Sequence, residues 1–228
     1  MQKKITKPSS CPHKGISTKA IETEKLESAQ AWQQEPPLDT RALILHQSAK
    51  LLREQGYAAV SLRQIANASG IKAGSIYYHF ASKEEILFHV LEEGLRVIME
   101  ETYDAINALP PETPFRERLK VAIKGHLYGL LQVGDFSSAN IRIYGQVPED
   151  VRKRHNIARR CYADWWDEFL TKAVAEGAMN SGLNLSVVRV FIVGALNWTV
   201  EWYRPDRGSF EALTDQIVAI VSDGLVID

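Results

Sequence analysis

The chain has 228 residues, of which 45% are hydrophobic and 24% are charged, values that are typical of soluble globular proteins and allow one or two domains. Two cysteines, Cys11 and Cys161, are too few for a disulfide framework or a cysteine-rich metal site, so we expect a reducing, cytoplasmic setting. The polar N-terminus shows no signal peptide, and the most apolar run, residues 190–196, is too short to cross a membrane.

The formal net charge of −1 hides an uneven distribution of charge. Residues 38–83 contain six cations and two anions, a net charge of +4, so the remainder of the chain carries −5. One basic segment on an otherwise acidic chain is expected of a protein that presents one end to phosphates. Nucleic acid is therefore a candidate partner.

Residues 1–37 are rich in Lys, Ser, Thr, Gln and Pro and poor in large apolar side chains. Such a composition buries too little surface to offset chain entropy, so we expect a flexible tail. An amphipathic helix is predicted next, over about residues 39–55, with Leu43, Ile44, Ala49 and Leu52 on its core face and Gly56 at its end.

Residues 60–80 organise the rest of the chain, because they predict two short helices joined by a tight turn. Ser61 and Gln64 form a capping box, in which each side chain satisfies a backbone N–H of the other residue. Ser69 and Gly70 end the first helix, and Ile71 and Ile76 face inward from the second. This layout is that of a helix-turn-helix, whose second helix enters the DNA major groove.

The outward side of the second helix separates a DNA reader from an ordinary helical hairpin. A hairpin that serves only stability would carry a solvated face of Glu and Lys, whereas the positions here are small, hydroxylated or aromatic. Gly74 costs about 1 kcal/mol relative to Ala in a helix, which fits a place where backbone approaches a partner closely. We therefore favour the DNA reader.

Three segments of the chain resemble those of a known family: Gly56-Tyr57, VSLRQIA and SGIKAGSIYYHFASKEEIL. Over about residues 40–90 the chain resembles the DNA-binding domain of the TetR family of bacterial repressors. The resemblance implies an all-helical homodimer with a three-helix reading head and a ligand-binding body that controls it. It also implies that these residues contact DNA: Arg63, Lys72, Ala73, Gly74, Ser75, Tyr77, Tyr78, His79 and Lys83.

Helices are predicted throughout the remainder of the chain. Ser82 and Glu85 start a long helix that links the head to the body, and Thr113 and Pro114 cap the following one. The expected helices cover about residues 82–108, 113–133, 135–146, 149–176, 187–203 and 210–225. The fold class is therefore all-α, with about nine helices.

The segment 187–203, preceded by Ser186 as its expected N-cap, is apolar nearly all round and must be covered on several sides. Gly194 and Ala195 would let another helix approach closely. The resemblance implies that this helix and 210–225 form a four-helix contact between the two chains of a homodimer. The alternative is a helix buried within a monomer.

No catalytic or metal-binding motif is present in the sequence, and six histidines are scattered without ligand spacing. We therefore expect no enzyme activity, no cofactor and no metal. The alternative from another class is a helical enzyme or ligand carrier that retains an unused DNA-binding head.

An effector pocket is expected among the helices of the body, between 82–108 and 149–176, where aromatic and polar side chains mix. The candidate residues are His126, Tyr128, Tyr144, Arg152, Arg159, Arg160, Trp165, Trp166, Phe169 and Asn197. Trp165 and Trp166 lie about 100° apart on one helix, so at most one can point squarely inward.

Arg152, Arg159 and Arg160 form a basic cluster that would suit the phosphates of a ligand, although a solvated helix face is the alternative. Residues 194–206 also resemble the C-terminal part of TetR-type regulators of fatty-acid and sterol breakdown, several of which respond to acyl-coenzyme A. We therefore predict a ligand-responsive repressor of a pseudo-palindromic operator. Its expected parts are a tail (1–37), a DNA-binding domain (38–84) and an effector-binding and dimerisation domain (85–228).

Overall fold

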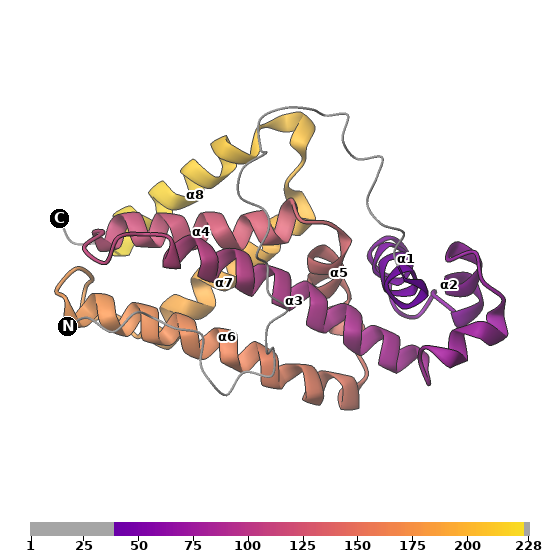
Figure 1. Ribbon diagram of the computed structural model, residues 1–228. Coiled ribbons are helices and arrows are strands. Elements are labelled where there is room, and N and C mark those ends of the chain that lie inside the picture. The colour runs from indigo at the N-terminus through magenta and orange to yellow at the C-terminus, as the bar shows by residue number, and fades with distance from the viewer. Residues whose placement is uncertain (1–38, 226–228) are drawn as a thin grey trace.

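A computed structural model describes residues 39–225 (Figure 1). The expected tail and Cys11 lie outside the described residues. The expectation of an all-α fold is confirmed, because the regular elements of the described chain are all helices. They are α1 (Thr40–Gln55), α2 (Leu62–Ala68), η1 (Ala73–Tyr78), α3 (Lys83–Asn107), α4 (Phe115–Leu131), α5 (Asp135–Ile143), η2 (Tyr144–Gln146), α6 (Glu149–Ala175), α7 (Leu185–Trp202), η3 (Pro205–Arg207) and α8 (Phe210–Leu225).

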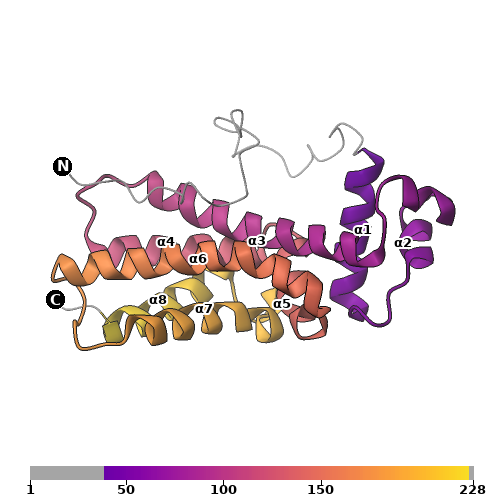
Figure 2. The same cartoon turned by 90° about the horizontal axis from the view of Figure 1, so that it is seen from below.

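Helix α3 is the long axis of the molecule. In both views it runs from α1 and α2 at one end into the bundle formed by α4, α6, α7 and α8 (Figures 1 and 2). Helix α5 lies between the two ends. We call α1, α2 and η1 the head and the elements from α4 to α8 the body.

The ends of the head helices follow from their capping residues. The Asp39 carboxylate accepts the Ala42 N–H at 2.7 Å, and Ser61 and Gln64 form the expected capping box at the start of α2. Gly56 has φ +78° after α1, a conformation that L side chains rarely adopt. The second helix of the predicted pair is the short 3-10 helix η1 rather than an α-helix.

The hydrophobic core of the head extends beyond its own helices. Ile44, Ile65 and Ile76 are buried together with Ala139 and Ile143 of α5. Arg53 of α1 also forms an ion pair with Asp135 at 2.6 Å. The head is therefore packed directly on α5 as well as joined to α3.

Helix α3 approaches α5 so closely that a side chain at Gly94 would collide with backbone. A Cβ atom at this position would lie 2.4 Å from the Phe136 carbonyl oxygen. The Ser137 hydroxyl donates a hydrogen bond to the Gly94 carbonyl at 3.1 Å in the same contact. Glycine is needed here for close packing, and the two helices are fixed to each other at this point.

Three predicted boundaries in the body were wrong. The Thr113 hydroxyl donates to the Pro110 carbonyl instead of capping α4, which begins after Pro114. Asn184, not Ser186, accepts the Val187 N–H and caps α7, because the helix starts at Leu185, two residues earlier than expected. The expected helix over 135–146 divides into α5 and η2.

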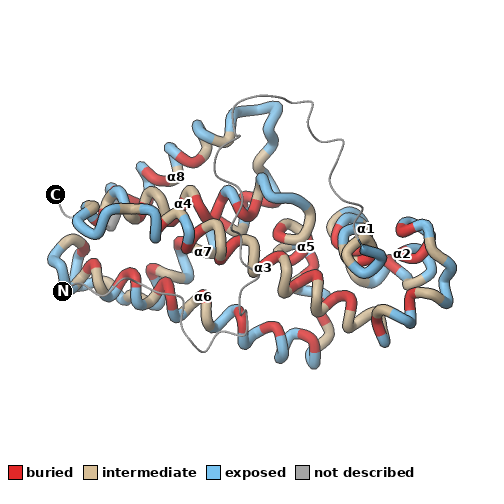
Figure 3. The backbone as a smooth tube through the Cα atoms, viewed as in Figure 1, coloured by how far each residue is buried: buried red, intermediate tan, exposed pale blue. Residues whose placement is uncertain are grey.

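The body core is rich in aromatic side chains from α6, and buried and exposed positions alternate along α6 and α8 (Figure 3). Helix α7 packs one face into this core. Of the described helices, α7 alone is long and apolar enough to cross a membrane. The apolar run 190–196 within it is too short to do so by itself. Core helices of soluble proteins pass the same test.

Candidate functional site

The head presents two tyrosines to solvent from η1. The side chains of Tyr77 and Tyr78 are 62% and 89% exposed, whereas the preceding residue of η1, Ile76, is fully buried in the head core. The two tyrosines are adjacent, and their rings and hydroxyls can offer a partner both apolar contact and hydrogen bonds. The short helix is thus held by its inner residue while its outer residues are available for contact.

The other residues expected at DNA differ in how exposed they are. Arg63, Lys72, Ala73 and Gly74 are exposed, and Ser75 and His79 are half-buried. A Cβ atom at Gly74 would meet nothing within 4 Å, so packing inside the protein does not require glycine there.

Lys83 faces the protein in this structure. Its Nζ donates to the Tyr57 carbonyl oxygen at 2.5 Å and lies 3.9 Å from the centre of the Tyr57 ring. Burial lowers the pKa of Lys83. The Tyr57 hydroxyl in turn donates to the Glu84 carboxylate at 2.7 Å. Lys83 therefore connects the loop before α2 to the first turn of α3, a role that sequence spacing did not indicate.

Two other cations of the basic segment are also engaged within the protein. Arg41 hydrogen-bonds the His89 ring at 3.1 Å, and Arg53 is paired with Asp135. The +4 charge of the segment therefore overstates the charge that can face phosphates. Arg63 and Lys72 are exposed.

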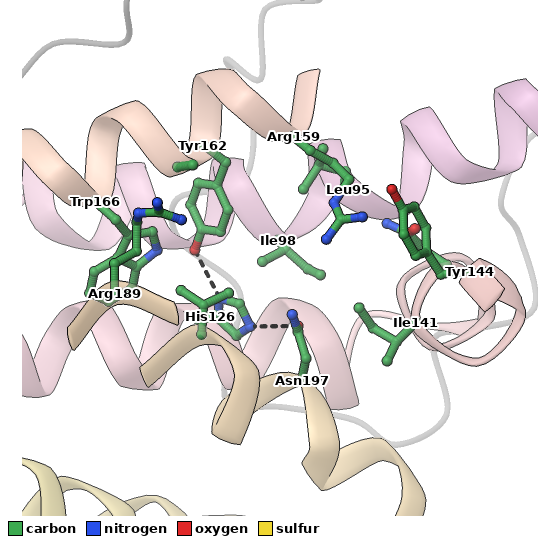
Figure 4. Close-up of a pocket in the computed structure, with 13 residues that line it drawn as sticks. Leu95, Ile98, His126, Ile141, Tyr144, Arg159, Tyr162, Trp166, Arg189 and Asn197 are labelled. Atoms are coloured by element: carbon green, nitrogen blue, oxygen red, sulfur yellow. Dashed lines mark hydrogen bonds between the residues drawn. The ribbon is translucent and has the colours of Figure 1, made fainter. Parts of the chain in front are cut away.

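The body contains a cavity of about 240 Å³ (Figure 4). Five helices and η2 supply its walls, which combine aliphatic, aromatic and cationic side chains. The lining residues are Leu95, Ile98, His126, Asn140, Ile141, Tyr144, Arg159, Tyr162, Ala163, Trp166, Arg189, Val193 and Asn197. A cavity therefore lies between α3 and α6, the region of the expected effector pocket, and α4, α5 and α7 also contribute to its walls. Its role as an effector site stays a prediction.

A buried hydrogen-bond network crosses one wall of the cavity. Nδ1 of His126 lies 2.9 Å from the Tyr162 hydroxyl, and Nε2 lies 3.1 Å from Oδ1 of Asn197 (Figure 4). Thr102 extends the network, since its hydroxyl lies 3.0 Å from that of Tyr162. The network joins α3, α4, α6 and α7.

Burial determines the protonation state of this network. It lowers the pKa of His126 from 6.5 to about 4 and raises the pKa of Tyr162. Both side chains are therefore neutral near pH 7. Because Oδ1 of Asn197 can only accept, Nε2 of His126 carries the ring hydrogen and Nδ1 accepts the Tyr162 hydroxyl hydrogen.

Half of the predicted effector residues lie elsewhere. Tyr128 is on the outside of α4, where its ring contacts Phe210 of α8. Arg152 and Arg160 point from α6 into solvent and do not line the cavity. Trp165 and Phe169 stack on each other in the core, with ring centres 5.3 Å apart. The expectation that at most one of the adjacent tryptophans points inward was wrong, because both are buried in the core, and Trp166 is the one that lines the cavity.

Arg189 and Tyr162 are lining residues that the sequence reasoning missed. Arg189 is the only cation within the apolar helix α7, and its Nε donates to Asp167 of α6 at 2.7 Å. A lone arginine in an apolar helix was the available signal. Tyr162 gave none, since it reads as an ordinary core aromatic of α6.

A stripe of exposed apolar side chains follows the outer face of α7. We call it the α7 stripe; it consists of Val187, Val190, Phe191, Trp198 and Trp202. Gly194 and Ala195 are exposed on the same side of the helix. Contiguous exposed apolar surface of this kind is expected at a protein interface.

The described residues hold no group of three or more His, Cys, Asp or Glu side chains that could bind a metal ion. His155 is the most buried acid–base candidate outside the cavity, and it is occupied by a 2.7 Å contact with Glu92.

Comparison with known proteins identifies two matching family models. A model described as bacterial regulatory proteins, tetR family, matches residues 44–90, and a tetracyclin repressor-like C-terminal domain matches residues 112–225. The repressor KstR2 of Mycolicibacterium smegmatis is 26% identical over 191 residues, 83% of this chain and 92% of that protein. The fatty acid metabolism regulator protein of Bacillus subtilis is 25% identical over 186 residues, 80% and 93% of the two chains.

The fold also matches solved structures. The crystal structure of AibR with isovaleryl coenzyme A and operator DNA superimposes with a TM-score of 0.72, over 80% of this chain and 97% of that one, at 20% identity.

Proposed function

Because this chain belongs to the TetR family of bacterial regulatory proteins, we propose that it represses transcription by binding operator DNA as a homodimer until a small molecule fills the body cavity. The observation that carries the DNA-binding part is the exposed pair Tyr77 and Tyr78 on a short helix held by buried Ile76. The names of the relatives, a repressor and a regulator of fatty acid metabolism, support the same reading.

We assign DNA contact to the exposed residues around η1. Arg63 and Lys72 would contact phosphates, and the two tyrosines would add hydroxyl donors and apolar contacts at the groove. Ala73 and Gly74 would let backbone approach the DNA, and Ser75 and His79 would contact it from the half-buried edge. Lys83 would act by fixing the loop before α2, and could reach a phosphate only by leaving Tyr57.

The α7 stripe is the proposed dimer contact, with the exposed part of α8 beside it. Its apolar side chains would be removed from water, and two heads would then face successive major grooves about 34–36 Å apart. Helix α7 is unsuited to cross a membrane, because Arg189 and Asn197 on the face opposite the stripe line the body cavity.

The proposed effector is a small molecule with an apolar body. A cavity of about 240 Å³ can enclose an acyl chain or a similar group, but a coenzyme A nucleotide would have to remain outside it. Of the three arginines first considered as an anion clamp, only Arg159 lines the cavity, where it lies 3.9 Å from the Tyr144 ring. Release requires that the ligand bind the DNA-incompetent state more tightly.

A DNA-binding measurement separates this function from that of a helical enzyme or carrier with an unused head. Purified protein is titrated onto labelled DNA taken from beside its own coding region, with unrelated DNA of equal length as the control. We expect at least a thousandfold preference for the adjacent DNA at physiological salt. Equal affinity for both DNAs would contradict the proposal, and a double variant Tyr77→Ala, Tyr78→Ala that binds unchanged would contradict the assigned surface.

A further inference from the structure

Arg41, in the first turn of α1, connects three parts of the head. We call residues 73–80, from η1 to Phe80, the reading segment. The Arg41 guanidinium hydrogen-bonds Nε2 of His89 in α3 at 3.1 Å, and it lies 4.8 Å from the centre of the Phe80 ring. The rings of Phe80 and His89 meet edge to face, with centres 5.8 Å apart. Phe80 is buried, and its N–H donates to the Ile76 carbonyl at 3.0 Å, so this three-way contact holds the end of the reading segment.

The hydrogen bond between Arg41 and His89 can exist only while the imidazole is neutral. A guanidinium carries donors and no acceptor, so Nε2 of His89 accepts and the ring hydrogen lies on Nδ1. Protonation would add a hydrogen to Nε2, and this N–H would face the arginine N–H. The hydrogen bond would then be lost, and two cations would face each other in its place.

Charged groups of both signs surround the His89 ring. They are Glu85, Glu92, Glu93 and Arg96 of α3, Arg41 of α1 and Arg154 of α6. Glu93 and Arg96 pair with each other. Burial, followed by Arg41, lowers the pKa of His89 from its ordinary value of 6.5, although Glu85 and Glu92 oppose this shift. The contact with Arg41 is therefore complete above pH 6.5 and is lost as the pH falls below that value.

We infer that Arg41 and His89 are positioning residues for DNA binding, which hold the reading segment on α3 only while the imidazole is neutral. This inference rests on the proposed function. Both residues act through Phe80, which ends the segment whose exposed side chains are assigned to DNA. A proton would then be a second signal, besides the ligand of the body cavity, that weakens binding to the operator.

The first test measures affinity for the labelled DNA from beside the coding region as a function of pH, by fluorescence anisotropy. Between pH 7.5 and pH 5.5 the unmodified protein should lose about tenfold in affinity, because each head takes up a proton that DNA binding must expel. His89→Gln keeps an acceptor for Arg41 but does not titrate. Its affinity should match that of the unmodified protein at pH 7.5 and change by less than about twofold at pH 5.5.

Two features of this test isolate His89. His79, which is assigned to the DNA surface, is present in both proteins, so its titration cancels in the comparison. Circular dichroism at both pH values checks that the proteins remain folded. An equal loss of affinity in the unmodified protein and in His89→Gln would overturn the inference.

The second test separates positioning from direct phosphate contact. Arg41→Met keeps an apolar stem against Phe80 but removes the charge and the donors. It should weaken DNA binding about fivefold at pH 7.5, leave the slope of log affinity against log salt unchanged, and reduce the acid loss to about twofold. A slope lower by about one would show that Arg41 itself neutralises a phosphate. That outcome, or an undiminished acid loss, would refute the positioning role.

The third test needs no DNA. Nuclear magnetic resonance follows the His89 ring hydrogens against pH in the unmodified protein and in Arg41→Met. The pKa of His89 should be higher in the variant, because a facing cation has been removed. An unchanged pKa with intact DNA binding would refute only the positioning pair. A raised pKa in a protein that binds no DNA at any pH would refute the proposed regulatory function instead.

Discussion

The head and the cavity achieve specificity in opposite ways. The head relies on residues that a compact fold leaves uncovered, with two tyrosines exposed above one buried isoleucine. The cavity relies on polar groups that the fold has removed from water, such as His126 and Trp166. A change at the head should therefore alter binding and spare stability, whereas a change around the cavity should alter both.

The α7 stripe should be an exception to this rule, because it belongs to the body yet is exposed. The largest expected effect concerns this surface. Phe191 is 64% exposed, so Phe191→Glu should leave the folded protomer intact but weaken the dimer by about 4 kcal/mol, since a buried unpaired charge is strongly unfavourable. Light scattering with size-exclusion chromatography measures the change in mass. Ile157→Glu, at an equally exposed apolar residue of α6, should leave the dimer unchanged. A dimeric Phe191→Glu protein would exclude this face.

Gly94 in the body contact and Gly74 in the head should differ in how much stability an added side chain costs. Gly94→Ala should lower the free energy of unfolding by about 3 kcal/mol, because its Cβ would collide with the Phe136 carbonyl at 2.4 Å. Gly74→Ala should change it by less than about 0.5 kcal/mol, because no atom lies within 4 Å. Urea denaturation followed by circular dichroism compares the two variants. Equal stability of both would show that α3 and α5 are not fixed at Gly94.

Acid should destabilise the cavity more than the head. The pKa of His126 is about 4 in the folded protein and 6.5 for an ordinary imidazole, so the unfolded chain binds a proton more readily between these values. Its contribution to stability is complete above pH 6.5 and falls as the pH drops toward 4, with about 2 kcal/mol lost at pH 5. Urea unfolding at pH 7 and pH 5 should show a smaller loss for His126→Gln than for the unmodified protein.

The smallest expected effects concern single phosphate contacts. Arg63→Ala and Lys72→Ala should each weaken DNA binding by about 1 kcal/mol and lower the slope of log affinity against log salt by about one. Lys83→Ala should lower this slope less, because its ammonium is held by Tyr57. Fluorescence anisotropy at several salt concentrations gives the slopes. A larger change for Lys83 than for Arg63 would show that Lys83 leaves Tyr57 when DNA binds.

Sequence reasoning was more successful for the head because the head is local in sequence. The capping box Ser61–Gln64, the turn at Gly70 and the buried Ile76 all depend on neighbours within a few residues, so spacing predicts them. What spacing could not predict was the tertiary engagement of Lys83, Arg41 and Arg53, which removes charge from the surface.

The cavity was predicted only in part because its walls come from distant segments. Five helices supply the lining, from Leu95 to Asn197 in sequence. Composition does not reveal which face of α6 points toward this space. Trp165 and Trp166 are chemically identical neighbours, and only tertiary packing separates core from lining. Of the cluster Arg152, Arg159 and Arg160, only Arg159 lines the cavity. Arg160 points about 100° away from it around α6, and Arg152 lies on the same face as Arg159 but two turns closer to the start of the helix.

Helix α7 lines the cavity with Arg189, Val193 and Asn197 while its other face carries the α7 stripe. In a dimer built on this stripe, a single helix per chain would separate each cavity from the partner. A ligand in one cavity would then displace the α7 stripe that both chains share. The second cavity would bind its ligand with a different affinity. Such a regulator would respond to its effector with a Hill coefficient other than one, because α7 would couple the two cavities through the dimer contact.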